Sequence, residues 1–365
     1  MFLASIDDFE ALAKKKLPKE IYDYFAGGAN GEITLRDNRA AYDKIKVIPR
    51  ILTGLCPRNL STSILGQDLT FPIMIAPMGF QGAACSEGEL ASIRAADASG
   101  IITVISTVSN ISLETAIEST SSPLWFQVYA YKNKDITKDL VVRAESAGYA
   151  AIVITADTAV LGRRERDIRN QFQFSQNLVA ANLTKYGFEK ISSEEVKGSS
   201  VESYVRNMFD ETISWHYIEW LRSITNLPII IKGLLHPDDA VLAISHGVSG
   251  VIVSNHGGRQ LDTVPATIDM LPKIVNAVAG RIPVLIDGGI RYGTDIVKAL
   301  SLGADAVLIG RPVIWGLAAS GQEGVQQVLE TLRQELDTAM ALCGFDSISN
   351  LKKNGKTLLY DLNLY

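Results

Sequence analysis

Eight short apolar runs, most of them rich in β-branched residues, constrain the fold of this chain more than any other feature. They are Pro72–Ala76, Ile102–Ile105, Leu124–Val128, Ala151–Ile154, Pro228–Ile231, Gly250–Val253, Ile282–Ile286 and Ala306–Ile309. Near-continuous apolar runs of this length are typical of parallel strands buried on both faces. Helix-compatible stretches lie between most of them, such as Gly88–Ala98, Ser112–Glu118 and Thr294–Leu302. Eight strands alternating with helices predict an α/β fold, the closed (β/α)8 or TIM barrel, and 365 residues fit one such domain.

The remaining segments define the expected domain organisation. We expect one domain over residues 1–365, with an N-terminal helical segment at 1–65 and the barrel at 66–345. In the first segment, Ser5 and Asp8 have the spacing of a capping box, and Pro18 can start a second helix over Lys19–Ala26. Between the fourth and fifth runs lies a polar, serine-rich stretch at 171–210. It predicts an active-site loop or lid, with a disordered surface insertion as the alternative.

A doubly wound open sheet is the rival architecture. That fold would place a Gly-x-Gly-x-x-Gly turn after an early strand. The first run is instead followed by Pro77, Met78, Gly79 and Phe80. The barrel is therefore the favoured interpretation.

Composition excludes several classes of protein. The chain has 35 Lys+Arg against 40 Asp+Glu and no long basic stretch, so we expect no nucleic-acid partner. Cys56, Cys85 and Cys343 are far apart, which argues against a disulfide scaffold and against a metal site. No uncharged apolar segment reaches 18 residues, so we expect no membrane span. Acidic residues at Asp7 and Asp8 come too early for a secretory signal, and the cytoplasm is the expected location.

Each predicted strand is followed at once by small, polar or charged residues. In chain order these are Pro77, Met78 and Gly79; Ser106; Gln127 with Tyr129; Thr155 with Asp157; Lys232; Ser254 with His256; Asp287, Gly288, Gly289, Ile290 and Arg291; and Gly310 with Arg311. Barrel enzymes carry their chemistry on the loops that follow the strands. Together these residues predict one polar ring at one end of the barrel.

Two of these loops predict a phosphate site. The loops that follow strands seven and eight of a barrel are where phosphate groups usually bind. Here they read Asp287-Gly-Gly-Ile-Arg291 and Gly310-Arg311. Glycines let backbone N–H groups approach an anion, and the guanidinium fork matches phosphate oxygens. The pattern indicates a phosphorylated ligand, with glycine turns and surface arginines as the alternative.

The segment from Ser254 to Asp262 carries the sharpest chemical signal. Only four histidines occur, and His256 alone lies at a strand end, three residues before Arg259. A histidine and an arginine placed this way can put a base and a carboxylate-binding group on one ligand.

At this segment the chain resembles the FMN-dependent L-2-hydroxy-acid oxidases, the family of glycolate, lactate and mandelate oxidases and related dehydrogenases. The similarity extends from Leu17–Tyr24 to about Met340–Leu342. It includes Thr155–Asp157, Leu161–Arg164, Ser254–Asp262, Asp287–Asp295 and Ile309–Val313.

The resemblance implies FMN as the cofactor and a role for each site residue. The flavin phosphate would lie on Gly289, Arg291, Gly310 and Arg311, within the loops that also hold Asp287, Gly288 and Ile290. The ring and ribityl chain would be held by Pro77, Met78, Gly79, Ser106, Gln127, Thr155 and Ser254, with Lys232 at the pyrimidine end. The substrate would contact Tyr24, Tyr129, Arg164 and Arg259. His256 would be the catalytic base, and Asp157 would orient it.

The implied reaction is oxidation of a small L-2-hydroxy acid to the 2-oxo acid, with O2 reduced to hydrogen peroxide. By the resemblance, Val108 stands where glycolate-oxidising members have tryptophan, and this together with Met78 favours lactate, a longer aliphatic acid or mandelate. The resemblance also implies a homo-oligomer, a tetramer or an octamer. Three alternatives stay open: a dehydrogenase with another electron acceptor, a phosphate-binding barrel enzyme without flavin, and an inactive FMN-binding protein.

Overall fold

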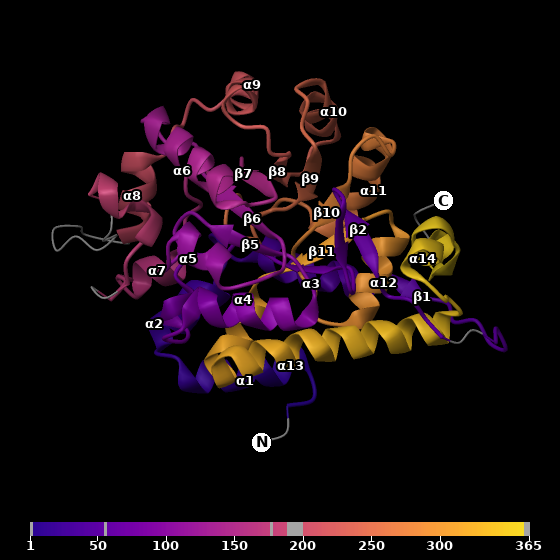
Figure 1. Cartoon of the computed structure of the whole chain (residues 1–365). Helices are drawn as coiled ribbons and strands as arrows, with labels where there is room; N and C mark the ends of the chain where they lie inside the picture. The colour runs from indigo at the N-terminus through magenta and orange to yellow at the C-terminus, as the bar shows by residue number, and fades with distance from the viewer. Residues whose placement is uncertain (1–2, 55–56, 176–177, 188–199, 361–365) are drawn as a thin grey trace.

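The computed structural model describes residues 3–54, 57–175, 178–187 and 200–360. Eight parallel strands form a closed barrel in the order β10-β11-β4-β5-β6-β7-β8-β9 (Figure 1). They are β4 (Ile73–Ile75), β5 (Thr103–Ser106), β6 (Leu124–Val128), β7 (Ala151–Thr155), β8 (Ile229–Leu234), β9 (Gly250–Val253), β10 (Val284–Ile286) and β11 (Ala306–Ile309). Each strand overlaps one of the eight apolar runs in sequence, so the (β/α)8 prediction is confirmed.

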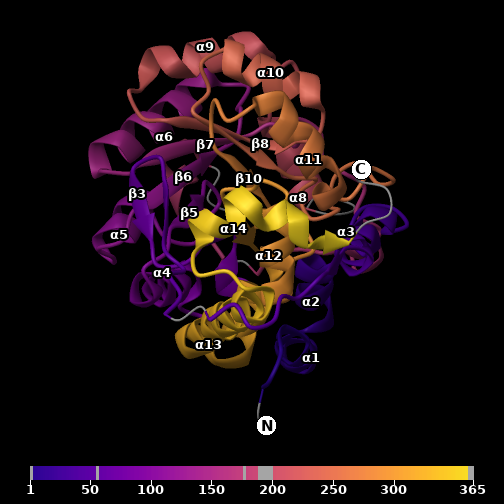
Figure 2. The ribbon, with the colours of Figure 1, turned by 90° about the vertical axis from the view of Figure 1, so that its right-hand side faces the viewer.

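Helices surround the barrel. Those that follow successive strands are α4 (Gly88–Ser99), α5 (Leu113–Glu118), α6 (Lys134–Ala147), α9 (Trp215–Ile224), α10 (Pro237–Ser245), α11 (Thr267–Val278), α12 (Gly293–Ser301) and α13 (Arg311–Cys343). Non-helical backbone at Ser320 and Gly321 divides α13 into two parts. Figure 2 shows α9 and α10 together at one side of the barrel.

The N-terminal segment forms α1 (Ile6–Lys16), α2 (Lys19–Ala26) and α3 (Ile33–Lys44). The predicted capping box is present, since Ser5 accepts a hydrogen bond from the Asp8 amide and the Asp8 side chain accepts one from the Ser5 amide. α1 runs alongside α13 (Figure 1). At the other end of the chain lie α14 (Ile348–Asn354) and β12 (Leu359–Tyr360), which pairs with β1 (Lys46–Val47).

A hairpin closes the amino-terminal end of the barrel. β2 (Thr62–Ile64) and β3 (Gln67–Leu69) are joined by Leu65 and Gly66, both in the left-handed region that a two-residue hairpin turn requires. Ile64 and Leu69 pack into the same apolar cluster as the inward-facing strand residues. Because this end is filled by side chains, a ligand has access only at the carboxyl ends of the strands.

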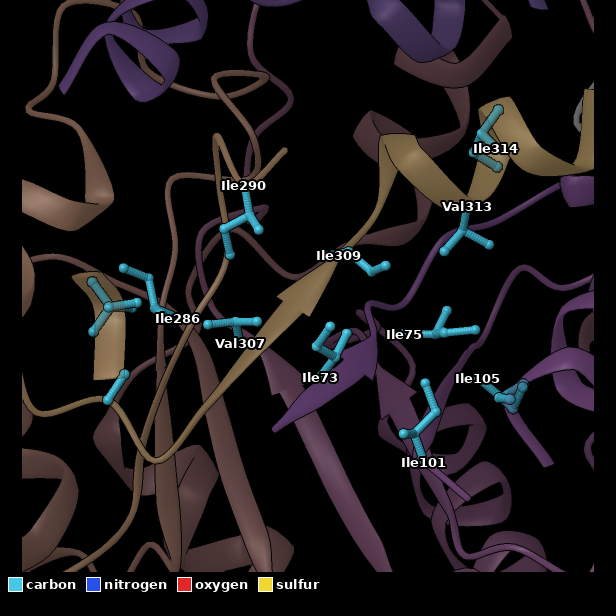
Figure 3. Packing of buried hydrophobic residues seen from close by; sticks show 14 of the residues in the cluster. Ile73, Ile75, Ile101, Ile105, Ile286, Ile290, Val307, Ile309, Val313 and Ile314 are labelled. Carbon is cyan, nitrogen blue, oxygen red and sulfur yellow. The ribbon is translucent and has the colours of Figure 1, made fainter. Parts of the chain in front are cut away.

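Alternation along each strand separates two cores. On β4, Met74 belongs to the barrel interior, whereas Ile73 and Ile75 pack outward against the helices. Figure 3 shows Ile75 and Ile309 of the outer core close to Val313 at the start of α13. This packing fixes where α13 begins, directly above the end of β11.

The predicted lid, residues 171–210, is described in part. Residues 176–177 and 188–199 lie outside the described residues. The described parts of the connection between β7 and β8 contain α7 (Glu165–Arg169), a 3-10 turn (Ala181–Tyr186) and α8 (Ser200–Met208).

Candidate active site

A cavity opens at the carboxyl ends of the barrel strands. It is lined by residues from almost every loop at this end, among them Pro77, Met78, Gly79, Tyr24, Tyr129, Arg164, Lys232, His256, Arg259, Asp287–Arg291, Gly310 and Arg311. The structure thus brings together most of the residues that the sequence analysis selected. They come from segments as distant along the chain as α2 and α13.

A layer of polar side chains lies at the carboxyl end of the barrel interior, and its positions follow from the alternation of residues along the strands. Val104, Trp125 and Val153 face the barrel interior, and two residues further along their strands come Ser106, Gln127 and Thr155. A step of two residues returns a strand to the same face, so the interior changes from apolar to polar near its carboxyl end. Lys232, Ser254, Asp287 and Gly310 follow inward residues of their own strands in the same way.

Two buried hydrogen-bond chains lie in this layer. Ser106 Oγ donates to Gln127 Oε1 at 3.1 Å, and Gln127 Nε2 donates to Thr155 Oγ1 at 3.0 Å. These three side chains lie beneath the residues that line the cavity. In the second chain, Lys232 Nζ donates to Ser254 Oγ and Ser254 Oγ donates to Asp287 Oδ2.

Lys232 forms an ion pair inside the protein. Its ammonium lies 3.0 Å from Asp287 Oδ2. Burial lowers the pKa of Lys232, but Asp287 and Asp157 outweigh burial and hold the pKa above its usual value. A cation is therefore fixed at one edge of the cavity.

His256 and Asp157 form a second pair, which is partly buried. His256 Nδ1 lies 3.0 Å from Asp157 Oδ1, and the Thr158 hydroxyl donates to the same carboxylate oxygen at 2.9 Å. The Thr158 oxygen also lies 3.3 Å from His256 Nδ1. The carboxylate can only accept, and the hydroxyl proton is committed to it. His256 therefore carries its proton on Nδ1, which leaves Nε2 as the basic nitrogen.

The pKa values of this pair follow from burial and charge. Burial raises the pKa of Asp157, but His256, Lys232 and Thr158 outweigh burial and hold the pKa below its usual range. Burial lowers the pKa of His256, with Lys232 and Arg164 acting in the same direction and Asp157 against them. At neutral pH the imidazole is thus uncharged beside a carboxylate, as a general base requires.

The local backbone geometry positions the side chains of both His256 and Asp157. His256 has φ 58°, and Gly257 and Gly258 follow in the same left-handed region, which turns the chain sharply after β9. Gly233 produces a bulge in β8, where a Cβ atom would come within 2.6 Å of the Asp157 side chain. Glycine at position 233 therefore lets Asp157 reach His256.

Arg164 and Arg259 lie beside Tyr24 and Tyr129. The Arg259 guanidinium carbon lies 5.0 Å from the centre of the Tyr24 ring. Burial and the neighbouring Arg164 lower the pKa of Arg259 to about 10, so the Arg259 guanidinium remains cationic at neutral pH. Arg164 Nε is buried and has no hydrogen-bond partner among the described residues.

The two predicted phosphate loops also line the cavity. Gly288 and Gly289 have φ 97° and 80°, and a Cβ atom on Gly289 would come within 1.9 Å of the Asn38 carbonyl oxygen. Only glycine fits there. Arg291 donates to the carbonyl of Ile290 at 2.9 Å.

Arg311 has partners that the sequence analysis did not anticipate. Its guanidinium donates to the carbonyl oxygens of Phe25, Gly27 and Gly257 at 2.8–2.9 Å. Burial, Arg259 and Arg291 lower the pKa of Arg311 to about 9.

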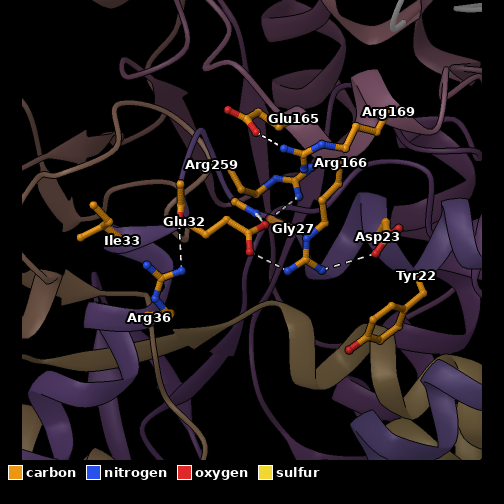
Figure 4. Close-up of polar contacts among 12 residues, drawn as sticks. Tyr22, Asp23, Gly27, Glu32, Ile33, Arg36, Glu165, Arg166, Arg169 and Arg259 are labelled. Atoms are coloured by element: carbon orange, nitrogen blue, oxygen red, sulfur yellow. Dashed lines mark hydrogen bonds and ion pairs between the residues drawn. The ribbon is translucent and has the colours of Figure 1, made fainter.

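Four cavity arginines are left without a counter-ion. Within residues 3–54, 57–175, 178–187 and 200–360, no carboxylate forms an ion pair with Arg164, Arg259, Arg291 or Arg311. Arginines elsewhere show the contrast, because Arg166 pairs with Asp23 and Glu32 (Figure 4). Cavity arginines that no carboxylate of the described residues pairs with indicate that the ligands are anions.

Sequence reasoning missed several lining residues. Val201, Tyr204 and Val205 of α8 line the cavity, as do Phe25 and Leu161. α8 begins 45 residues after the end of β7, so no local pattern connects it with the strand ends. Thr158 could have been found, because it follows Asp157 directly.

Among the residues that the structure describes, no group of three or more His, Cys, Asp or Glu side chains could hold a metal ion. No helix in that part of the chain is long and apolar enough to cross a membrane.

Residues 13–357 match the family described as FMN-dependent dehydrogenase. The chain belongs to this family. It is 47% identical over 360 residues to 2-hydroxyacid oxidase 1 of Homo sapiens, covering 98% of this chain and 96% of the relative. It is 46% identical over 352 residues to glycolate oxidase 3 of Oryza sativa subsp. indica, covering 96% and 95%. A crystal structure of mandelate oxidase with (S)-4-hydroxymandelic acid superposes with a TM-score of 0.93 at 41% identity, covering 98% of both chains.

The cavity residues fit the cofactor of the family. FMN carries a phosphate, for which Arg291, Arg311 and the glycines of both loops offer donors and space. Its flavin ring is polar at the pyrimidine edge, where Lys232 offers a fixed cation. The buried Asp287 Oδ1, which has no partner in the described part of the chain, adds an unused acceptor beside it.

Proposed function

We propose that this protein is an FMN-dependent (S)-2-hydroxy-acid oxidase, which converts a small L-2-hydroxy acid to the 2-oxo acid. One observation carries the proposal. The cavity contains a neutral histidine, His256, which a carboxylate orients. It also contains two arginines that no described carboxylate pairs with, Arg164 and Arg259, and the two glycine-arginine loops. A base, a carboxylate-binding pair and a phosphate site are the groups that this reaction needs.

The substrate carboxylate binds between Arg164 and Arg259 in this proposal. Two guanidinium groups provide planar donors that match a carboxylate. Tyr24 and Tyr129 donate hydrogen bonds to the substrate from the same side of the cavity. Burial raises the pKa of Tyr129, so its hydroxyl remains protonated and can act as a donor.

His256 takes a proton from the substrate through Nε2. Asp157 accepts from Nδ1–H, keeps the ring in the required tautomer and stabilises the imidazolium that forms. FMN, when bound, would supply the oxidant, taking up the two electrons and the second proton that leave the substrate. Lys232 would hold a positive charge where negative charge develops on reduction.

The remaining predicted residues hold the cofactor. The phosphate is assigned to Gly289, Arg291, Gly310 and Arg311, with Asp287, Gly288 and Ile290 shaping the loop. The ring and ribityl chain are assigned to Pro77, Met78, Gly79, Ser106, Gln127, Thr155 and Ser254.

Apolar cavity residues support a substrate with an apolar side chain. Val108, Leu161, Val201 and Val205 line the cavity. Apolar walls favour lactate, a longer aliphatic 2-hydroxy acid or a mandelate-like acid over glycolate, which offers no side chain to bury. Mandelate oxidase, the structural neighbour described above, was solved with (S)-4-hydroxymandelic acid.

We further propose O2 as the electron acceptor, with release of hydrogen peroxide, and a homo-oligomeric assembly. The single domain, the lid role of 171–210 and the cytoplasmic location also remain predictions from the sequence. An Arabidopsis relative at 47% identity is named a peroxisomal (S)-2-hydroxyacid oxidase, so cell fractionation is the direct check of location.

The visible spectrum of the purified protein tests the function. We expect flavin absorption that bleaches when L-lactate or L-mandelate is added without oxygen, and that returns in air with one peroxide per substrate. His256→Gln should retain the flavin absorption but bleach at least a thousandfold more slowly. A colourless protein, or a yellow one that no 2-hydroxy acid bleaches, would refute the proposal. Bleaching without peroxide would identify a dehydrogenase instead.

A further inference from the structure

The carboxyl end of α2 carries a substrate-side residue but no basic residue of its own. Tyr24 lies in the last turn of this helix, and none of the residues in that turn is Lys or Arg. The carbonyls at the end of a helix lack intrahelical donors and carry partial negative charge. They are therefore expected to find donors elsewhere in the structure.

Two cavity arginines supply those donors. Arg311 donates from Nε to Phe25 O at 2.9 Å and from a terminal nitrogen to Gly27 O at 2.8 Å. Arg259 donates to Tyr24 O at 2.5 Å and to Gly27 O at 3.2 Å; Figure 4 shows Gly27 and Arg259 in contact. Arginines from two different loops of the barrel thus cap α2.

Arg311 also reaches the loop that carries the base. Its other terminal nitrogen donates to Gly257 O at 2.9 Å. The two segments that Arg311 joins also touch directly, because Ala29 N donates to Gly258 O at 2.8 Å. A Cβ atom on Gly28 would come within 2.9 Å of that same oxygen, so the backbones pack without a side chain between them.

We propose that Arg311 is a positioning residue that couples the cofactor-phosphate loop to the substrate side of the cavity. Its fork holds the end of α2, and with it Tyr24, against the His256 loop. The inference deepens the proposed function and rests on it for the identity of the two ligands. In this proposal, loss of FMN and loss of order at the end of α2 are linked through the Arg311 side chain.

The charges explain why the phosphate would matter to this link. Arg259, Arg291 and Arg311 repel one another, as the effect of the first two on the pKa of Arg311 indicates. An anion between Arg291 and Arg311 removes part of that repulsion. FMN binding should therefore tighten the contacts that Arg311 makes with α2, and by linkage a tighter α2 should favour FMN.

Hydrogen exchange followed by mass spectrometry tests the coupling in the FMN-loaded protein. The variant is Arg311→Lys, which keeps the charge but loses the fork. Arg291→Lys is the matched control, because it alters the same phosphate site without touching α2. We expect exchange of amides 25–32 to be at least tenfold faster in Arg311→Lys than in wild type, with β6 as the unchanged internal reference. In Arg291→Lys, exchange of these amides should stay within twofold of wild type.

Steady-state kinetics at saturating FMN gives a second readout. Arg311→Lys should raise the substrate KM about tenfold, and the factor by which kcat falls should be smaller than that. Unchanged exchange in Arg311→Lys, or equal acceleration in both variants, would overturn the coupling.

The wild-type protein provides a measurement that does not depend on recovering a folded variant. Exchange of amides 25–32 should slow several-fold when FMN is added to the apoprotein, and the absence of any slowing would also overturn the proposal. The exchange data stand even if no 2-hydroxy acid is oxidised, so failure of the coupling and failure of the proposed function are distinguishable.

Discussion

Asp157→Asn isolates the charge of the carboxylate from its hydrogen bonds. The asparagine carbonyl oxygen can replace Asp157 Oδ1 and still accept from His256 Nδ1–H and from the Thr158 hydroxyl. The amide nitrogen would take the place of Oδ2, which has no partner among the described residues. Geometry and tautomer are therefore preserved, while the negative charge beside the imidazolium is lost.

The size of the effect follows from the distance. Two unit charges 3.0 Å apart attract by about 5 kcal/mol at an effective dielectric constant of about 20. The hydrogen bond that the amide retains offsets about 1–2 kcal/mol of this loss. The remaining 3–4 kcal/mol predicts a kcat lowered about 10²- to 10³-fold. KM should change less than threefold, because Asp157 does not touch the substrate in the proposed arrangement.

The pH profile adds a signed prediction. His256 acts as a base only when neutral, so kcat/KM falls as the pH drops through its pKa. Asp157 raises that pKa, and removing its charge lowers it further below the usual value. The acid limb of kcat/KM should therefore move to lower pH in Asp157→Asn.

Stopped-flow bleaching of the flavin by substrate over a range of pH measures both effects. Asp97→Asn is the control, since the Asp97 carboxylate accepts hydrogen bonds only from Thr120, Ser121 and Ser122 among the described residues. Its kinetics should match wild type within twofold. A plateau for Asp157→Asn within threefold of wild type, or an acid limb that moves to higher pH, would refute the assigned role of the carboxylate.

Three further substitutions test other parts of the structure. Arg259→Met removes one of the two carboxylate-binding cations and should raise KM about 100-fold with flavin content unchanged; an unchanged KM in the oxidase assay would exclude Arg259 from substrate binding. Gly289→Ala places a Cβ against Asn38 O and should abolish FMN retention, which the ratio of flavin to protein absorbance reports; normal flavin content would contradict the close approach. Burial raises the pKa of Glu89 to about 7, so its contribution to stability is complete below the unfolded pKa of about 4.5 and is lost as the pH rises through 7. Glu89→Gln should therefore lose less Tm than wild type between pH 5.5 and 8, and parallel Tm curves would show that the Glu89 carboxyl does not titrate in this range.

The barrel and the gathering of most candidate site residues at one cavity could be predicted because both depend on local patterns. An inward apolar residue such as Val153 is followed two positions later by Thr155 and four positions later by Asp157, so strand periodicity alone leads from core to site. Glycine-arginine loops are similarly visible, since within each loop the residues assigned to the phosphate lie within five positions of one another. These features need no knowledge of which segments meet in space.

Contacts between distant segments could not be predicted in this way. Arg311 and its acceptors on Phe25 and Gly27 are separated by 286 and 284 positions, and no periodicity connects them. Arg311 was consequently assigned to phosphate alone. The apolar residues of α8 that line the cavity could not be predicted for the same reason. The number of residues between β7 and α8 does not indicate which side chains of α8 face the strand ends.

The two proposed ligands draw on different parts of the chain. The proposed cofactor residues lie on the strands and loops of the barrel, whereas Tyr24, one of the four proposed substrate residues, reaches the cavity together with Phe25 from a helix that precedes the first barrel strand. Residues 18–30 are held to the barrel by Arg311 and by the loop after β9. A design that replaces this segment to alter substrate preference therefore has to keep the carbonyl acceptors of Arg311, because a segment that displaced them would weaken FMN binding as well as substrate binding.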